Sequence, residues 1–287
     1  MYVCDRVLGR TAYVIVPYQY GYLISDASSV VLVNNNMEEV SCFKIPNPAH
    51  ICVSDNGKDA VVITTEGEVF VIDLIKRQLK KVDQQHSEEG NNPVFWSDCF
   101  WWTDWNGSAF CYNTKDGGFK EILNKYNKGI VPQDIMIDKK HNTICFSAYI
   151  KGKGETAIYR LSSDDRTDKI DVPLKKTGLC IYAMDENSNV FIYNKYDNTI
   201  STFEIIKNDL VLFDKREISH QTTFDHLSVF NDKLILWSDK CVSVFKAVTY
   251  EKLFEFNGCY ISNVSINADK LCVGTWENAY IFSFLKR

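Results

Sequence analysis

The side chains of this sequence with the clearest chemical potential are acids that follow a Ser or Thr at the end of short apolar runs. The pairs are Ser25-Asp26, Thr65-Glu66, Thr103-Asp104 and Ser238-Asp239, with Thr275-Trp276-Glu277 as a displaced variant. An Asp at the start of a tight turn accepts backbone N–H groups two residues further on, so we expect a turn-forming role. The alternative is an acidic rim in which Asp26, Asp104 and Asp239 attract the basic side chains of a partner.

Histidines form the second group of candidates. Four of the five, at positions 50, 86, 220 and 226, fall in or beside connections between groups of apolar runs, whereas His141 does not. Imidazole titrates near neutrality, so it could act as a metal ligand or a general base. The four histidines belong to three different connections and show no HxH or HExxH spacing. We therefore predict neither a metal site nor a cofactor, and keep His220 and His226 as binding candidates.

Aromatic side chains form the third group, and the run WWTDW holds three of the six tryptophans. Trp101 and Trp102 lie in a strand-like segment whose two faces would both pack against neighbouring sheets, so burial explains them. Trp105 lies in the connection that follows, and Tyr260 and Trp276 lie in other connections. Exposed Trp and Tyr are enriched at interface hot spots and stack on sugars or bases. We expect these three to bind a partner, unless they fold back over a sheet edge.

The elements that must position these residues are strands. No window sustains helical periodicity, whereas short β-branched and aromatic runs bounded by Gly, Asn, Asp and Lys occur throughout, which predicts an all-β fold. The runs group into quartets: 11–18, 22–25, 30–33 and 40–45; 50–53, 60–64, 68–74 and 78–82; 94–97, 99–103, 108–112 and 119–123; then four runs each within 134–173, 178–218 and 227–256. A seventh set has three runs, 262–266, 270–274 and 279–284.

The strand missing from the seventh set has a candidate in residues 2–7, which no other set uses. Pairing these residues with the last set would close a ring and remove the open end of the array. The sets recur roughly every 40 residues, the period of propeller blades. We predict one domain over 1–287, an all-β, seven-bladed β-propeller of four-stranded antiparallel blades, closed by the N-terminal strand joining the last blade.

In such a propeller the blade-to-blade links and the hairpins between second and third strands open on one face, which is where binding usually occurs. The candidates expected on this face are Asp26, Asp104, Asp239, Trp105, Tyr260, Trp276, His220 and His226.

Two short motifs in the second set carry a family resemblance. The turn Ser54-Asp55-Asn56-Gly57-Lys58 is similar to the S-P-D-G-K turn of WD-repeat and YVTN-type propellers, and the strand VFVIDL at 69–74 resembles the V-x-V-W-D-L strand of WD repeats. Other sets lack the Gly-His dipeptide and show degenerate Trp-Asp positions. The S-x-D-x-G-x-T-W boxes of sialidases and the repeated Gly-Gly of kelch blades are missing too. The resemblance implies a propeller scaffold that binds proteins or peptides.

Composition narrows the classes of partner. The formal net charge is −5 and no run of five or more Lys/Arg occurs, so we expect no nucleic-acid partner. Charges at Asp5 and Arg6 interrupt a signal peptide, and no segment approaches the ~18 apolar residues of a membrane helix. The expectation is a soluble cytoplasmic protein without a membrane partner.

Ten cysteines would suit a disulfide framework if they lay in the loops of a small domain. Most lie instead inside apolar runs, for example Cys42, Cys52, Cys145, Cys180 and Cys272. No CxxC pair occurs, so zinc ribbons and thioredoxin-type centres find no support. We expect reduced thiols that pack as small hydrophobes.

No catalytic signature such as a P-loop or a G-x-S-x-G elbow is present. The leading hypothesis is a non-enzymatic protein- or peptide-binding scaffold that uses aromatic anchors and an acidic rim, with the oligomeric state left open. The alternative is a propeller hydrolase or lyase acting on a carbohydrate or peptide at the central axis. Paired carboxylates ~5 to 9 Å apart would serve glycoside chemistry there. A subunit of a larger assembly is a third possibility.

Overall fold

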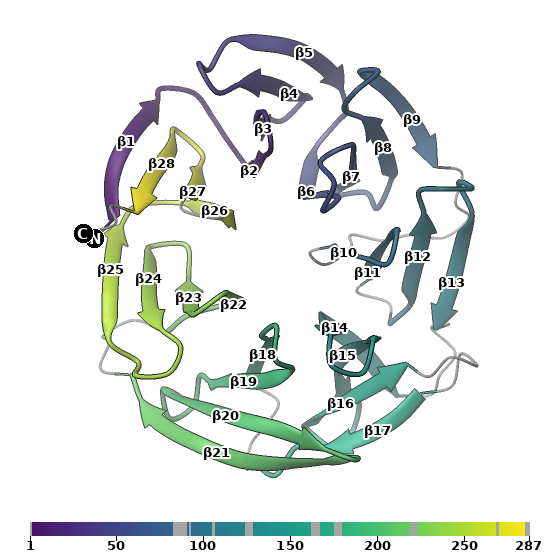
Figure 1. Cartoon of the computed structure of the whole chain (residues 1–287), viewed down its shortest axis with the longest axis vertical. Coiled ribbons are helices and arrows are strands. Elements are labelled where there is room, and N and C mark those ends of the chain that lie inside the picture. Colours follow the sequence, from purple (N-terminus) through teal and green to yellow (C-terminus); the bar gives the residue numbers. More distant parts are fainter. Residues whose placement is uncertain are drawn as a thin grey trace.

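The structure, a computed structural model, describes residues 2–82, 91, 93–104, 107–123, 129–161, 167–174, 180–218, 223–267 and 270–284. The described residues form seven sheets of four antiparallel strands. Figure 1 shows the sheets arranged as blades of a ring, each with its first strand at the centre. The predicted all-β, seven-bladed propeller is confirmed.

The blades follow chain order, and each runs from the inside of the ring to the outside. Blades 1 to 3 comprise β2 (Val14–Tyr18), β3 (Gly21–Ser25), β4 (Ser29–Asn34) and β5 (Glu39–Lys44); β6 (Pro48–Val53), β7 (Asp59–Thr64), β8 (Val69–Asp73) and β9 (Gln78–Val82); and β10 (Val94–Trp96), β11 (Cys99–Thr103), β12 (Ala109–Asn113) and β13 (Phe119–Leu123). Blades 4 and 5 comprise β14 (Ile130–Asp138), β15 (Thr143–Ile150), β16 (Glu155–Leu161) and β17 (Thr167–Asp171); and β18 (Cys180–Met184), β19 (Asn189–Asn194), β20 (Thr199–Ile206) and β21 (Asp209–Glu217). Blades 6 and 7 comprise β22 (His226–Phe230), β23 (Lys233–Trp237), β24 (Cys241–Lys246) and β25 (Lys252–Asn257); and β26 (Ile261–Asn267), β27 (Lys270–Thr275), β28 (Ala279–Phe284) and β1 (Tyr2–Leu8).

The ring closes as predicted. Strand β1 pairs antiparallel with β28, from Tyr2 opposite Phe284 to Leu8 opposite Ala279. At the same seam Gly274 lies so close to blade 1 that a Cβ atom there would be 2.4 Å from the carbonyl oxygen of Ala12. Only a residue without a side chain allows this approach of the two backbones.

The core lies between the blades, because the middle strands are apolar on both faces and pack against the blade on either side. Strand β3 is buried along its whole length, and its Leu23 shares a hydrophobic cluster with Val62 of blade 2. Trp102 is buried between Ile63 of blade 2 and Phe110 of its own blade, which confirms that burial explains it. Trp101 is half-buried and donates its indole N–H to the Trp96 carbonyl at 3.2 Å.

The cysteines are all free thiols. Cys145, Cys180 and Cys272 are buried, as their apolar neighbours predict, and burial raises the pKa of Cys145 and of Cys272 to about 12. Cys42 departs from the prediction and is exposed, because it lies on β5, an outermost strand with solvent on one face.

No part of the chain described in the structure forms a helix long and apolar enough to cross a membrane.

One strand differs clearly from its predicted bounds. Strand β14 begins at Ile130, four residues before the predicted start of its set. A β-bulge explains the difference, since Pro132 pairs with Ala148 but Ile135 pairs with Phe146. Gln133 and Asp134 therefore share one opposing residue, Ser147, and the apolar alternation of the strand is interrupted there.

Candidate functional site in the central channel

The loops predicted to share a face do so. The link residue Asn47 donates its N–H to the carbonyl of Ala27 at 2.9 Å and accepts the N–H of Thr65 at 3.0 Å, both in hairpins between second and third strands. Ile261 donates its N–H to the Asp239 carbonyl at 2.9 Å in the same way. We call this side the link face, and the side with the remaining turns the opposite face.

Two of the predicted acids form turns, as expected, and one of them is buried. Asp104 is 1% exposed, and its Oδ1 accepts the backbone N–H of Ser108 at 2.8 Å, so its assignment to an exposed binding rim is wrong. Its side chain is turned inward because it completes the hairpin. Asp26 accepts the Ser28 N–H at 2.9 Å and the Ser29 hydroxyl at 3.0 Å. Burial alone would raise the pKa of Asp26, but these hydrogen bonds hold it below its usual value.

Three of the predicted binding residues lie exposed together on the link face. Tyr260 and Trp276 are each 57% exposed and stack with ring centroids 5.0 Å apart and planes inclined by 15°. Tyr13 meets Trp276 edge to face at 6.4 Å. Asp239 is exposed in the hairpin whose carbonyl holds Ile261, the residue after Tyr260. Their exposure matches the prediction, and a binding role for them stays a prediction.

Two further candidates, Trp105 and His220, lie outside the described residues, as does His86.

His226 lies in the central channel and not at an exposed rim. It begins β22, and its ring stacks on Trp237, its partner across the sheet, with centroids 3.7 Å apart and planes inclined by 15°. Burial lowers the pKa of His226 to about 4; the charge of Lys195 acts in the same direction and that of Asp225 against it. The imidazole is therefore neutral at pH 7 and held in one orientation by the stack.

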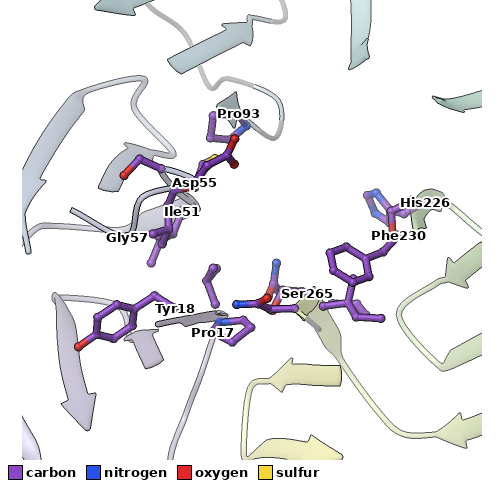
Figure 2. Close-up of a pocket in the computed structure, with 18 of the residues that line it drawn as sticks. Pro17, Tyr18, Ile51, Asp55, Gly57, Pro93, His226, Phe230 and Ser265 are labelled. Atoms are coloured by element: carbon purple, nitrogen blue, oxygen red, sulfur yellow. The ribbon is translucent and has the colours of Figure 1, made fainter. Parts of the chain in front are cut away.

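The channel contains two cavities, of about 840 and 650 Å³. Both are lined by Asp134, His226 and Phe230, so the two spaces meet at these residues. In Figure 2, His226 and Phe230 project from one side of the larger cavity, and Ile51 and Asp55 from another. Volumes of this size suit a small-molecule ligand.

Asp134 is the carboxylate at the meeting point of the two cavities. The bulge in β14 turns it toward Ser147, whose hydroxyl accepts the Asp134 N–H at 3.1 Å and donates to Asp134 Oδ2 at 3.1 Å. Bulges of this kind are common beside active sites, where they change the direction of a side chain. The neighbouring Gln133 carbonyl accepts the amide of Asn91 at 2.9 Å and the hydroxyl of Thr103 at 3.0 Å, so blade 3 anchors the bulge.

The environment of Asp134 favours its protonated form. Burial within the ring raises its pKa to about 6, although the Ser147 hydroxyl, the Tyr182 N–H and the charge of Lys195 oppose the shift. Part of the side chain is still accessible from the channel. A partly accessible carboxyl that titrates close to neutrality can both take up and release a proton under ordinary conditions.

The sequence prediction missed Asp134 and did not select His50, which lines the smaller cavity. The available signal was an acid in the middle of a mostly apolar innermost strand, VPQDIMID. Within the described part of the chain, no group of three or more His, Cys, Asp or Glu side chains is arranged to hold a metal ion.

No protein-family model matches the sequence. A search of curated proteins likewise found no match. Solved structures do match. Virginiamycin B lyase from Staphylococcus aureus superimposes with a TM-score of 0.74 at 13% identity, covering 99% of this chain and 100% of the lyase. A catalytically inactive His-to-Ala variant of that lyase with quinupristin gives 0.75 at 12% identity over the same shares. A streptogramin B lyase gives 0.71 at 12% identity, covering 96% of this chain and 93% of that one.

These matches change the interpretation in two ways. The resemblance to WD-repeat and YVTN-type propellers is confirmed as far as the seven-bladed fold, although the matched structures are lyase propellers. The leading prediction of a non-enzymatic protein- or peptide-binding scaffold is wrong, because structures that match over the full length are enzymes and favour the alternative. At 12–13% identity the likeness establishes the fold.

Proposed function

We propose that this chain is a propeller lyase that binds a small carbohydrate or peptide-like substrate in the central channel. The observation that carries the proposal is Asp134, a carboxyl with a pKa of about 6 that opens into the two joined cavities. A pKa near the working pH is what general acid–base catalysis requires of its proton carrier.

Asp134 would act as the base. In an elimination, its carboxylate removes a proton from a carbon beside an electron-withdrawing group, and the C–H electron pair forms a new double bond. The bond to the leaving group breaks with its electrons on the leaving atom, to which Asp134 then returns the proton. The Ser147 hydroxyl donates to Oδ2, which fixes the orientation of the carboxyl.

His226 would orient the substrate. Its imidazole is neutral at pH 7 because burial lowers its pKa to about 4, so it offers a hydrogen bond and no charge. The stack on Trp237 fixes the ring plane, and Phe230 supplies an apolar surface in the same cavities. One polar contact and an apolar wall are the usual composition of a small-molecule site.

The matched structures support this reading. They are lyases with the same ring of blades, and one of them contains quinupristin. In that structure the lyase is catalytically inactive after a single His-to-Ala change, so a histidine is needed for catalysis in that propeller.

The test is turnover by the purified chain of quinupristin and of a panel of uronic-acid oligosaccharides and esterified peptides, followed by mass spectrometry. A lyase yields products whose masses sum to that of the substrate, whereas a hydrolase adds one water. We expect kcat/KM to rise as the pH increases through about 6 and to level off above it, because the carboxylate is the active form.

The Asp134→Asn variant should lose at least about a hundredfold in kcat, the usual contribution of a general base. Asp209→Asn is the matched control, since Asp209 is exposed on outer strand β21 and should keep the wild-type rate. Wild-type turnover by the Asp134→Asn enzyme would refute the assignment of the base. A wild-type chain that neither converts nor binds any member of the panel would count against the lyase.

A further inference from the structure

A groove on the opposite face, between blades 5 and 6, plays no part in the proposed chemistry. Its volume is about 820 Å³, and it is bounded by β20 and β21 of blade 5 and by the turn 247–250 of blade 6. Tyr250 lies at its side, where its hydroxyl is hydrogen-bonded to that of Thr202 in β20. Blades 5 and 6 are thus in contact at one side of the groove, through Thr202 and Tyr250.

Phe213 stands at the edge of this groove. In the pairing of β20 with β21, Thr202 lies opposite Asp214 and Phe203 opposite Leu212, so Phe213 is the extra residue of a β-bulge. A bulge bends its strand and changes the direction of the side chain it carries. Here the ring is 81% exposed.

The same bulge in two other blades shows what is unusual about Phe213. Blade 1 has Val40 as the extra residue of β5, and blade 6 has Leu253 as the extra residue of β25. Val40 packs against the cluster shared with blade 2, and Leu253 against the cluster shared with blade 7. At the corresponding place in blade 5, the bulged side chain lies in solvent and a groove remains beside it.

Further apolar surface surrounds Phe213. Val248, in the turn of blade 6 across the groove, is 75% exposed. Leu212 and Val211 on β21 are exposed as well, at 51% and 47%. Exposed apolar side chains on both sides of a groove are characteristic of interaction surfaces.

Acidic side chains outnumber basic ones along the lining of the groove. Among the described residues that line it, the carboxylates are Asp185, Glu186, Glu204, Asp214 and Asp232, and the only cation is Lys140. Four of the five carboxylates are already paired: Glu204 with Lys140 at 3.2 Å, Asp232 with Lys233 at 2.9 Å, Asp214 with Arg216 at 3.1 Å and Glu186 with Lys139 at 3.8 Å. These are surface pairs, which contribute little free energy, so a partner's Lys or Arg can exchange with them.

We propose that this groove docks an extended segment of a partner protein in which apolar side chains alternate with Lys or Arg. Phe213 and Val248 form the two apolar walls that hold an aromatic or aliphatic side chain of the segment. The surrounding carboxylates receive its cations, which gives specificity and a faster association rate. The sequence analysis expected a partner with basic side chains on the link face. The groove lies on the opposite face.

The test uses a fluorescein-labelled peptide in which Lys alternates with Phe and Leu, and measures binding by fluorescence anisotropy. We expect the wild-type chain to bind it, and Phe213→Ser and Val248→Ser each to weaken binding roughly tenfold, as loss of an anchor in an interface centre does. Glu204→Gln combined with Asp232→Asn should weaken binding several-fold and reduce its sensitivity to salt. All four side chains are at the surface, so the variants should keep the fold.

Ile75→Ser is the matched control, because Ile75 is 59% exposed on the turn after β8, the position in blade 2 that corresponds to Val248. It should bind like the wild type. The proposal is overturned if the wild type does not bind the peptide, if Ile75→Ser weakens binding as much as Phe213→Ser, or if a peptide with Glu in place of Lys binds equally well. It is also overturned if the wild type dimerises in sedimentation and Phe213→Ser abolishes the dimer, which would assign the groove to a second copy.

Discussion

Replacing Asp134 by Asn should stabilise the folded chain at neutral pH. Folding raises the pKa of Asp134 from 3.8 to about 6, so between these values the folded state holds a proton that the unfolded state has released. Raising the pH through this window therefore lowers the free energy of unfolding, and the loss is complete above the folded-state pKa. Asn carries no charge that burial could penalise, so the variant escapes the loss.

The magnitude follows from the two pKa values. The difference between 3.8 and about 6, at 1.36 kcal/mol per pKa unit, amounts to about 3 kcal/mol once the carboxyl is fully ionised. Near pH 4 the folded carboxyl is protonated and the unfolded one is only partly ionised, which leaves about 0.6 kcal/mol. The advantage of Asp134→Asn over the wild type should therefore grow by about 2 kcal/mol between pH 4 and pH 8.

Urea unfolding followed by tryptophan fluorescence measures this difference for the two proteins at each pH. Asp138→Asn is the matched control, because Asp138 lies on the same strand. Burial alone would raise the pKa of Asp138, but hydrogen bonds from Ser188 and His141 hold it below its usual value. Its stabilising contribution is present above the unfolded-state pKa and is lost as the pH falls.

Removing the Asp138 charge also leaves Arg160, whose Nη2 is 3.2 Å from Asp138 Oδ2, without that partner. Asp138→Asn should thus destabilise the chain by about 3 kcal/mol at pH 8 and by less at pH 4. If Asp134→Asn were less stable than the wild type at pH 8, or if its advantage did not change with pH, the assigned cost of ionising Asp134 would be wrong.

Two further substitutions test the frame of the ring. Asp104→Ala removes the acceptor of the buried Ser108 N–H and should lower the free energy of unfolding in urea by about 1–3 kcal/mol. Binding of a ligand in the channel should be unchanged. A loss of binding without a loss of stability would instead place Asp104 in the binding rim. Gly274→Ala places a Cβ 2.4 Å from the Ala12 carbonyl oxygen and should lower the free energy of unfolding by at least about 1–3 kcal/mol. An unchanged midpoint of urea unfolding would show that the backbones at Gly274 and Ala12 can move apart at no cost.

The fold was predictable because each blade repeats the same local signals. Apolar runs end at turn-forming residues, and the spacing of these runs survives even where individual motifs have degenerated. The N-terminal strand was found by the same reasoning, since the seventh set lacked one partner and residues 2–7 had none.

The site was harder to predict because it depends on the direction in which a few side chains point. Asp134 reaches the channel through a bulge, and a bulge shifts the alternation of a strand without leaving a mark in composition. His226 was selected from its position near a link, but its stack on Trp237 joins residues of two strands and appears only once their register is known. Asp104 was wrongly expected to be exposed, because an acid in a hairpin usually faces solvent. The structure shows that it is buried and hydrogen-bonded to the Ser108 N–H.

The seam of the ring has a consequence for how the protein is made. Strand β1 is synthesised before every other strand of the ring, and its partner β28 after every other. Until β28 leaves the ribosome, β1 has no partner strand and blade 7 is incomplete, so the growing chain is an open arc. Its first strand can pair with another chain, and its last blade has an uncovered face. The ring therefore closes only after nearly all of its strands have been synthesised. A translational pause before the last blade would prolong the interval in which two incomplete chains can associate with each other.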